Sequence, residues 1–331
     1  MKTPVIIISG FLGSGKTTLL LELIKELHNR KLKPAILMNE LGKADVDGMI
    51  LSETAGDIPL EKLFDGCICC SKKSEISGSL KSLLTLAPDV ILVELTGVAN
   101  PEEVVDAMAE PELLNEVLLH RIVTVVDAEH VLEYNSIFAS DKQLVHTLRR
   151  QLDVADMVIV NKHDLVSDDH VSKVARLIKK HNERAAIFNT IHAKFDLAAV
   201  TRGLIPLKLQ AKPSGPFKVI SPPQGNGHSH EPGHKHGQPS FSRVQTVYIP
   251  ISGQTPFSLK KMEKLLKNQG NHVLRAKGYV SLNGSSDASL IQFSGKQLRH
   301  ERTTYKGPYY LVVIGYDLDE QTLLDQWKSI G

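Results

Sequence analysis

All three cysteines of this chain of 331 residues lie within four positions, as Cys67, Cys69 and Cys70. A disulfide framework needs cysteines at distant positions, so three thiols this close together do not form one. Three thiolates can instead hold one soft divalent ion and leave its fourth tetrahedral position open. The spacing predicts a transition-metal site, with Glu40 or a histidine from elsewhere as the fourth ligand. Zinc is the favoured metal, and cobalt(II) and copper(I) suit the same ligands.

Other interpretations of the three thiols stay open. They are a closed structural zinc site, a redox switch, or cysteines that are simply buried. A second set of metal-type side chains lies in a segment rich in Pro, Gly and Ser, where imidazoles could collect metal weakly or only belong to a polar linker. These side chains are His228, His230, His234 and His236.

A glycine-rich stretch, Gly10 to Thr17, has the P-loop pattern of a glycine, four residues and then Gly-Lys-Thr. Such a turn, between a strand and a helix, directs backbone N–H groups and the helix N-terminus at phosphate oxygens. Lys16 would reach the β and γ phosphates, and Thr17 would hold Mg²⁺. We therefore expect phosphate-binding residues at Gly10, Gly13, Ser14, Gly15, Lys16, Thr17 and Thr18.

The base of the nucleotide is indicated by Asn161-Lys162-His163-Asp164, which follows a predicted strand. An aspartate at a sheet end can accept hydrogen bonds from both the ring N–H and the exocyclic amine of guanine, whereas adenine has no matching pair of donors. Asp164 is therefore predicted to select GTP, with Asn161 and Lys162 packing around the base. Helix capping by Asp164 is the structural alternative.

Hydrolysis is predicted to depend on Lys16, Glu94 and Gly97. Glu94 ends a strand at the position of an acid for the Mg²⁺ shell, and the backbone N–H of Gly97 could contact the γ-phosphate. Val98 cannot orient a water molecule, so we expect slow intrinsic hydrolysis. A paired strand-end carboxylate without a metal role is the alternative for Glu94.

The elements that must position these residues alternate between strand and helix. A predicted helix covers 16–29, and predicted strands cover 5–9, 34–38, 90–94, 121–126, 157–160 and 185–188. This pattern predicts an α/β fold, a P-loop NTPase with a mostly parallel sheet, followed by a small α+β C-terminal domain. We expect a P-loop domain at 1–212, a flexible linker at 213–242 and the second domain at 243–331.

Composition excludes several classes of partner. The chain carries 39 basic and 37 acidic residues, a formal charge of +2, without a long basic run, so no nucleic-acid partner is expected. No apolar stretch approaches the roughly 20 residues of a membrane helix. We expect a cytoplasmic protein with reduced thiols. The sequence leaves open whether it forms a homo-oligomer.

With these motifs in place, the chain resembles the CobW family of P-loop GTPases, which act as metal chaperones or metal-insertion factors. Lys43 and Asn100 stand where acids are common in that family, so we do not count either as a metal ligand. The resemblance implies that Glu40 and Asp47 lie in a nucleotide-responsive segment. It is carried by residues 10–18, 39–42, 46–48, 66–70, 94–97, 124–128, 161–164 and 275–278, together with the histidine-rich linker.

Three functions compete. The favoured one is a GTP-hydrolysing metallochaperone that binds Zn²⁺ in a nucleotide-dependent way and delivers it to a client protein docked on the second domain. The alternatives are a regulatory GTPase switch with a purely structural zinc site, and a P-loop kinase. A kinase would have no use for Asn161 to Asp164.

Overall fold

The computed structural model describes residues 2–40, 60–64, 71–136, 141–206, 242–251, 258–270, 272–282, 287–294 and 297–330. Of these, 39–40, 60–64, 71–74 and 329–330 are described by their backbone alone.

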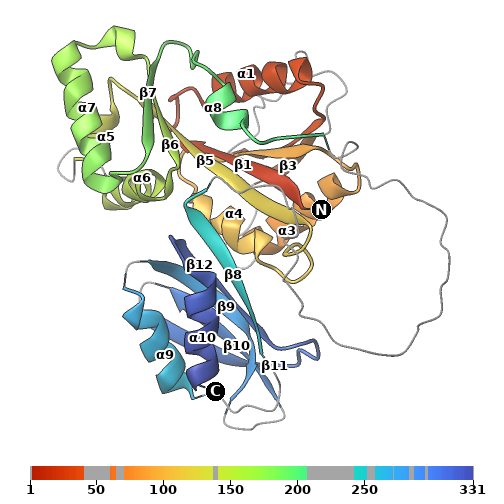
Figure 1. Ribbon diagram of the computed structural model, residues 1–331. Helices are drawn as coiled ribbons and strands as arrows, with labels where there is room; N and C mark the ends of the chain where they lie inside the picture. The colour runs from red at the N-terminus through yellow and green to blue at the C-terminus, as the bar shows by residue number, and fades with distance from the viewer. Residues whose placement is uncertain are drawn as a thin grey trace, which may run out of the picture.

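The N-terminal part of the described chain holds a parallel sheet of seven strands in the order β3-β2-β4-β1-β5-β6-β7 (Figure 1). Runs of buried Val, Ile and Leu build its central strands, as expected for a sheet that is covered on both faces. The strands are β1 Thr3–Gly10, β2 Pro34–Glu40, β3 Leu60–Phe64, β4 Val90–Glu94, β5 Val117–Asp127, β6 Met157–Asn161 and β7 Ala186–Thr190. The predicted parallel sheet is confirmed.

Helices cover both faces of this sheet. In Figure 1, α1 and α8 lie on one side, and α3 and α4 lie on the other. Local signals explain several boundaries: Asp141 caps α6 through Gln143 N at 2.8 Å, and Pro101 occupies the first turn of α4. The helices are α1 Lys16–Asn29, α3 Ser71–Leu84, α4 Pro101–Met108, α5 Val131–Tyr134, α6 Lys142–Val154, α7 Asp168–His181 and α8 Ala198–Thr201.

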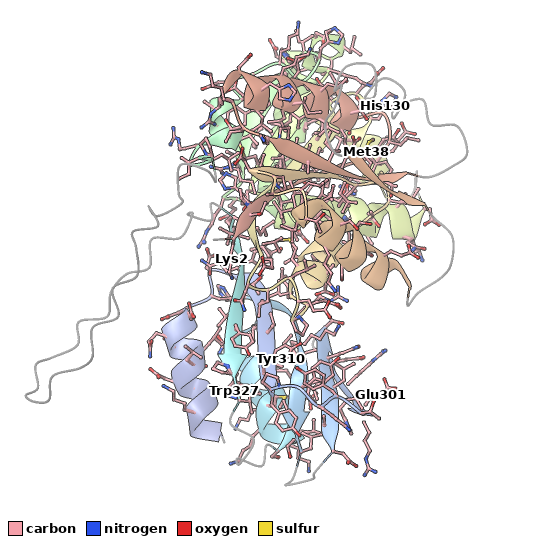
Figure 2. The ribbon with its side chains drawn as sticks, turned by 90° about the vertical axis from the view of Figure 1, so that its right-hand side faces the viewer. Lys2, Met38, His130, Glu301, Tyr310 and Trp327 are labelled. Atoms are coloured by element: carbon pink, nitrogen blue, oxygen red, sulfur yellow. The ribbon has the colours of Figure 1, made fainter. Side chains whose placement is uncertain are left out.

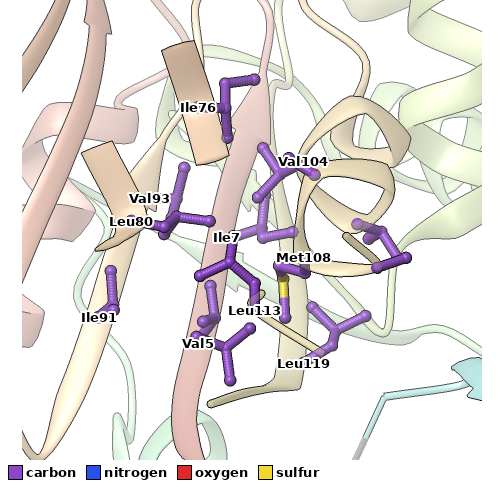
Figure 3. Close-up of a cluster of buried hydrophobic side chains, with 14 of the residues drawn as sticks. Val5, Ile7, Ile76, Leu80, Ile91, Val93, Val104, Met108, Leu113 and Leu119 are labelled. Carbon is purple, nitrogen blue, oxygen red and sulfur yellow. The ribbon is translucent and has the colours of Figure 1, made fainter. Parts of the chain in front are cut away.

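Side chains along β1 point alternately to the two faces of the sheet, so the core around the sheet consists of two layers. Val5 and Ile7 point to the cluster that contains α3 and α4, whereas Ile6 and Ile8 point to the cluster that contains α1. Figure 3 shows the first cluster, where Leu80 of α3 and Val104 of α4 converge on β1. The strand that carries the glycine-rich turn is therefore clamped from both sides.

The C-terminal part is an antiparallel sheet of five described strands in the order β11-β10-β9-β12-β8, with α9 and α10 on one face. Met262 of α9 and Trp327 of α10 fill the core of that face, and Figure 2 shows Trp327 and Tyr310 in this part of the molecule. The elements are β8 Val244–Pro250, α9 Leu259–Asn268, β9 Val273–Ser281, β10 Ala288–Ser294, β11 Gln297–Thr303, β12 Tyr310–Tyr316 and α10 Glu320–Ile330.

The opposite face of the five-stranded sheet packs against the N-terminal part. Val312 and Ile314 belong to the same buried cluster as Leu113, and Arg275 forms an ion pair with Asp106. Beside this contact lies a cleft of about 940 Å³ lined by charged and polar side chains of both parts. None of the described helices is long and apolar enough to cross a membrane.

Candidate functional site

The glycine-rich turn joins β1 to α1, as the sequence predicts, and its backbone folds around the Lys16 side chain. Lys16 Nζ donates to the carbonyl of Phe11 at 3.0 Å, and Ser14 N donates to the same carbonyl at 3.3 Å. Helix α1 begins at Lys16, immediately after Gly15, which is left-handed with φ 105°. The lysine and the helix N-terminus are thus on the same turn, the arrangement that favours a bound phosphate.

Asn161, at the carboxyl end of β6, locks this turn to the sheet. Its Nδ2 donates to Ser14 O at 2.9 Å, and its Oδ1 accepts from Thr190 Oγ1 at 3.1 Å and from Ala193 N at 2.9 Å. A Cβ at Gly15 would lie 2.4 Å from Asn161 Nδ2, so only glycine fits there. Asn161 was predicted to lie beside the base, and the described contacts give it a structural task in holding the turn.

Thr17 and Glu94 meet at the same edge of the sheet. Thr17 Oγ1 donates to Glu94 Oε1 at 2.8 Å, and Glu94 is only 5% exposed. The β1–β4 register pairs Ile8 with Glu94, which places the carboxylate beside the glycine-rich turn. The two residues predicted to hold Mg²⁺ are thus in contact. They fit that ion, because Mg²⁺ binds hydroxyl and carboxylate oxygens.

Gly97 lies against the backbone of the glycine-rich turn at Phe11 and Leu12. A Cβ at this position would lie 2.5 Å from Leu12 N, so a larger residue would push the two segments apart. Leu95 N donates to Ile8 O at 3.0 Å and continues the pairing of β4 with β1 as far as this point. The segment predicted to contact a γ-phosphate therefore packs directly on the P-loop.

Lys162 and Asp164 follow β6 in a tight turn. Lys162 is left-handed, with φ 60°, and its Nζ lies 2.7 Å from Asp127 Oδ2 at the end of β5. Burial raises the pKa of Asp127, but the hydrogen bond from Lys162 and the other nearby donors outweigh it and hold this pKa below its ordinary value. Asp164 lies in a short 3₁₀ helix, His163–Leu165, with its side chain exposed. It is free to meet a ligand at the sheet end.

The predicted transition-metal ligands lie outside what the structure describes. Cys67, Cys69, Cys70 and the four linker histidines are not described, and Glu40 is described only by its backbone at the end of β2. Among the described residues, Asp127, Glu129 and His130 place ligand-type atoms within 4.8 Å of one another. Asp127 already accepts from Lys162 and from Glu129 N, so this group forms a hydrogen-bonded cluster.

Two residues of this region received no role from the sequence. Asp127 was named only within the stretch 124–128, and its partner Lys162 is 35 positions away. Gln151 is buried under the Gly97 segment. In the sequence it stands out only as a polar residue within the apolar stripe of α6. Neither role follows from local spacing, because both depend on contacts between strands and helices that are distant in the sequence.

The glycine-rich turn lies at the carboxyl end of the central strand of a parallel sheet, with Lys16, Thr17 and Glu94 around it. This arrangement defines a P-loop nucleotide-binding protein. Residues 4–189 match the family described as CobW/HypB/UreG, nucleotide-binding domain, and residues 248–330 match the cobalamin synthesis protein cobW C-terminal domain. The chain belongs to the CobW family of P-loop GTPases, as its resemblance implied.

Curated relatives span most of the chain. A zinc chaperone CobW of Pseudomonas aeruginosa is 28% identical over 99% of this chain and 91% of its own length. The zinc chaperone YjiA of Escherichia coli is 26% identical over 87% of this chain and 85% of its own length. A zinc-regulated GTPase metalloprotein activator of Schizosaccharomyces pombe is 32% identical over 58% of this chain and 47% of its own length.

Two solved structures are similar in outline. The Zn(II)-bound YjiA GTPase of E. coli aligns with 100% of this chain and 99% of its own, at 20% identity and a TM-score of 0.44. HypB of Helicobacter pylori in complex with nickel aligns with 57% of this chain and 79% of its own, at 20% identity and a TM-score of 0.40.

Proposed function

We propose that this protein is a GTP-hydrolysing metallochaperone that binds Zn²⁺ through Cys67, Cys69 and Cys70, with Glu40 as the fourth ligand, and delivers it to a client protein. In this proposal GTP and Mg²⁺ bind at the P-loop, Thr17 and Glu94, and Asp164 selects guanine. The cysteines stay reduced because the protein works in the cytoplasm. The first 212 residues form the GTPase domain, 213–242 the linker, and 243–331 the domain on which the client docks.

The observation that carries this proposal is the register at the carboxyl edge of the parallel sheet. Glu40 pairs with Phe64 across β2 and β3, and Met38 pairs with Glu94 across β2 and β4. In the sequence, Cys67 follows Phe64 by three residues and Cys70 directly precedes α3. The three cysteines therefore belong to the connection between β3 and α3, and β3 ends at the same edge of the sheet as Glu40 and Glu94.

Coupling between the metal and nucleotide sites follows from this common edge. Segments that contact a γ-phosphate change arrangement on hydrolysis. In this proposal the change at the Gly97 segment after β4 is passed to the metal ligands at the end of β2 and after β3. A hundredfold change in Zn²⁺ affinity between the GTP and GDP states corresponds to about 2.8 kcal/mol. By reciprocity, Zn²⁺ changes the preference for GTP over GDP by the same factor. The relatives named zinc chaperones support zinc as the cargo.

A competition titration tests the proposal. The protein is loaded with a GTP analogue, with GDP or with no nucleotide, and Zn²⁺ is partitioned between it and a chromophoric chelator. We expect one tight site whose affinity depends on the nucleotide and which Cys69→Ser abolishes. Ser82→Ala, on the exposed side of α3, is the matched control.

Equal Zn²⁺ affinities in the three states would contradict the delivery function. If Cys69→Ser also unfolded the protein, a structural zinc site in a regulatory GTPase would be the better description. Replacing all four linker histidines by alanine separates weak collection of metal by the linker from binding at the cysteines.

A further inference from the structure

Gln151 is a polar side chain in the apolar stripe of α6, and it is completely buried. Its Nε2 donates to Ala99 O at 3.0 Å and to Gly97 O at 3.3 Å. Both neighbours are carbonyl oxygens, so the amide must present its nitrogen to them. Within the described residues, Gln151 Oε1 has no hydrogen-bond partner. The two donated bonds are therefore the polar interactions of this side chain.

The segment held by Gln151 also packs against the P-loop. Ala99 N donates to Thr96 O at 3.1 Å and closes a tight turn around Gly97. A Cβ at Gly97 would lie 2.5 Å from Leu12 N. The turn thus has close backbone contact with the P-loop and also accepts hydrogen bonds from the Gln151 amide.

Gln151 is itself held at a fixed distance from β1. Its backbone carbonyl accepts from Thr124 Oγ1 at 2.9 Å, and Thr124 Oγ1 is 2.8 Å from Ser9 Oγ. Ser9 directly precedes Gly10, the first residue of the glycine-rich turn. Gln151 thereby links the Gly97 turn, through its side chain, to β1, through its backbone, and adds to the pairing of β4 with β1 that ends at Leu95.

We propose that Gln151 is the positioning residue that holds the Gly97 turn against the P-loop and so sets the preference for GTP over GDP. This inference rests on the proposed contact of Gly97 with the γ-phosphate and deepens it. GDP has no γ-phosphate, so a displaced Gly97 turn weakens the binding of GTP and leaves the P-loop contacts with GDP in place. Glutamine is required at position 151 because its NH₂ group supplies two donors at the length that reaches both carbonyls.

Gln151→Met keeps the length and the apolar packing of the side chain and removes both donors. We measure the dissociation constants of a GTP analogue and of GDP with Mg²⁺, the kcat and KM of GTP hydrolysis, and the thermal unfolding temperature. The expected result is GTP-analogue binding about tenfold weaker, GDP binding unchanged within about twofold, and a lower kcat. Gln143→Met, on the exposed face of the same helix, is expected to match the wild type in every measurement.

Gln151→Glu provides a readout that a purely structural role would not move. The introduced carboxylate faces two carbonyl oxygens without a proton, but the protonated acid can donate one hydrogen bond. Burial raises the pKa of such a carboxyl group toward neutrality. We measure the preference for GTP over GDP relative to the wild type at each pH. This preference is expected to recover in Gln151→Glu as the pH is lowered from 8 to 6, and Gln151→Met is expected to show no recovery.

Two results would overturn the inference and leave the proposed function intact. One is that Gln151→Met weakens the binding of GTP analogue and of GDP equally. The other is that the preference for GTP over GDP is the same in Gln151→Met and Gln151→Glu as in the wild type. A wild-type protein that binds GTP analogue and GDP equally would also overturn the inference about Gln151, whereas the proposed function is tested separately by the Zn²⁺ affinities in the three nucleotide states. If Gln151→Met does not fold, the pH dependence of Gln151→Glu decides the question by itself.

Discussion

Asp156 accepts a hydrogen bond from the backbone N–H of Arg243 at 2.6 Å, and this bond ties the parallel sheet to the first strand of the antiparallel one. The other carboxylate oxygen of Asp156 accepts from Ile122 N at 2.7 Å, within β5. One buried carboxylate thus joins strands from both parts of the chain. Nearby, Asn182 caps the end of α6 and also accepts from Arg243 Nη1 at 2.6 Å.

The junction at Asp156 is expected to make stability depend on pH. Burial raises the pKa of Asp156 to about 6, against the backbone hydrogen bonds that lower it. The folded protein therefore holds this proton more tightly than the unfolded chain does. The contribution of Asp156 to the free energy of unfolding is fully present below the pKa that this carboxyl group has in the unfolded chain. It is lost as the pH rises through about 6. Its size is about 3 kcal/mol, from a shift of about two units.

Urea unfolding of the wild type and of Asp156→Asn between pH 4 and 8 measures this contribution. The stability of the wild type relative to the variant is expected to fall as the pH rises, with most of the change between pH 4 and 7. A constant difference across that range would show that Asp156 does not titrate in this window. Glu116→Gln, which removes an exposed carboxylate before β5, controls for the loss of one negative charge.

Selection of guanine is expected to depend on Asp164. Asp164 is proposed to accept from the ring N–H and the exocyclic amine of guanine. Asp164→Asn replaces one of its acceptor oxygens by a donor, so GTP binding should weaken by about a hundredfold or more. Xanthosine triphosphate, which has a carbonyl in place of that amine, should bind the variant better than GTP does. Nucleotide competition with GTP, ATP and xanthosine triphosphate measures both effects. Unchanged selectivity would remove Asp164 from the base site.

Mg²⁺ dependence is expected to change in Glu94→Gln. The carboxylate is buried beside Thr17, and the amide that replaces it carries no charge to attract the ion. The Mg²⁺ concentration for half-maximal GTP hydrolysis should rise about tenfold or more, and GDP binding without Mg²⁺ should change little. Glu116→Gln, at an exposed position before β5, is the control and should leave both values unchanged. A Glu94→Gln variant with normal Mg²⁺ dependence would assign this glutamate a purely structural role.

The contact between the two sheets is expected to be important for stability. Leu113 is fully buried in the cluster that also contains Val312 and Ile314 of β12. Leu113→Ala should lower the free energy of unfolding by about 2–5 kcal/mol, because it removes buried methyl groups and leaves a cavity. Leu86→Ala, at an exposed position after α3, should change it by less than about 0.5 kcal/mol. Chemical denaturation of the two variants measures the difference.

Elements with a strong local pattern were predicted well. The helix at 16–29 is found with those bounds, and the strand at 90–94 is β4. The edge strands β3 and β11 were not predicted, since Gln297–Thr303 carries mostly polar, exposed residues and lacks an apolar alternation. Its pairing with β10 makes it a strand, and no property of the seven residues alone requires that.

The sequence by itself determined the glycine-rich turn, the parallel sheet around it and the membership in a nucleotide-binding family. These features depend on the spacing of residues that are close in the chain and on the periodic placement of apolar residues. Both can be read directly from the sequence. Only the tertiary structure decided that Gln151 holds the Gly97 turn, that Asn161 bonds to the P-loop and that Asp156 joins the two sheets. Each of these contacts joins residues at least 54 positions apart. Their partners are set by how the strands and helices pack, so no local signal identifies them.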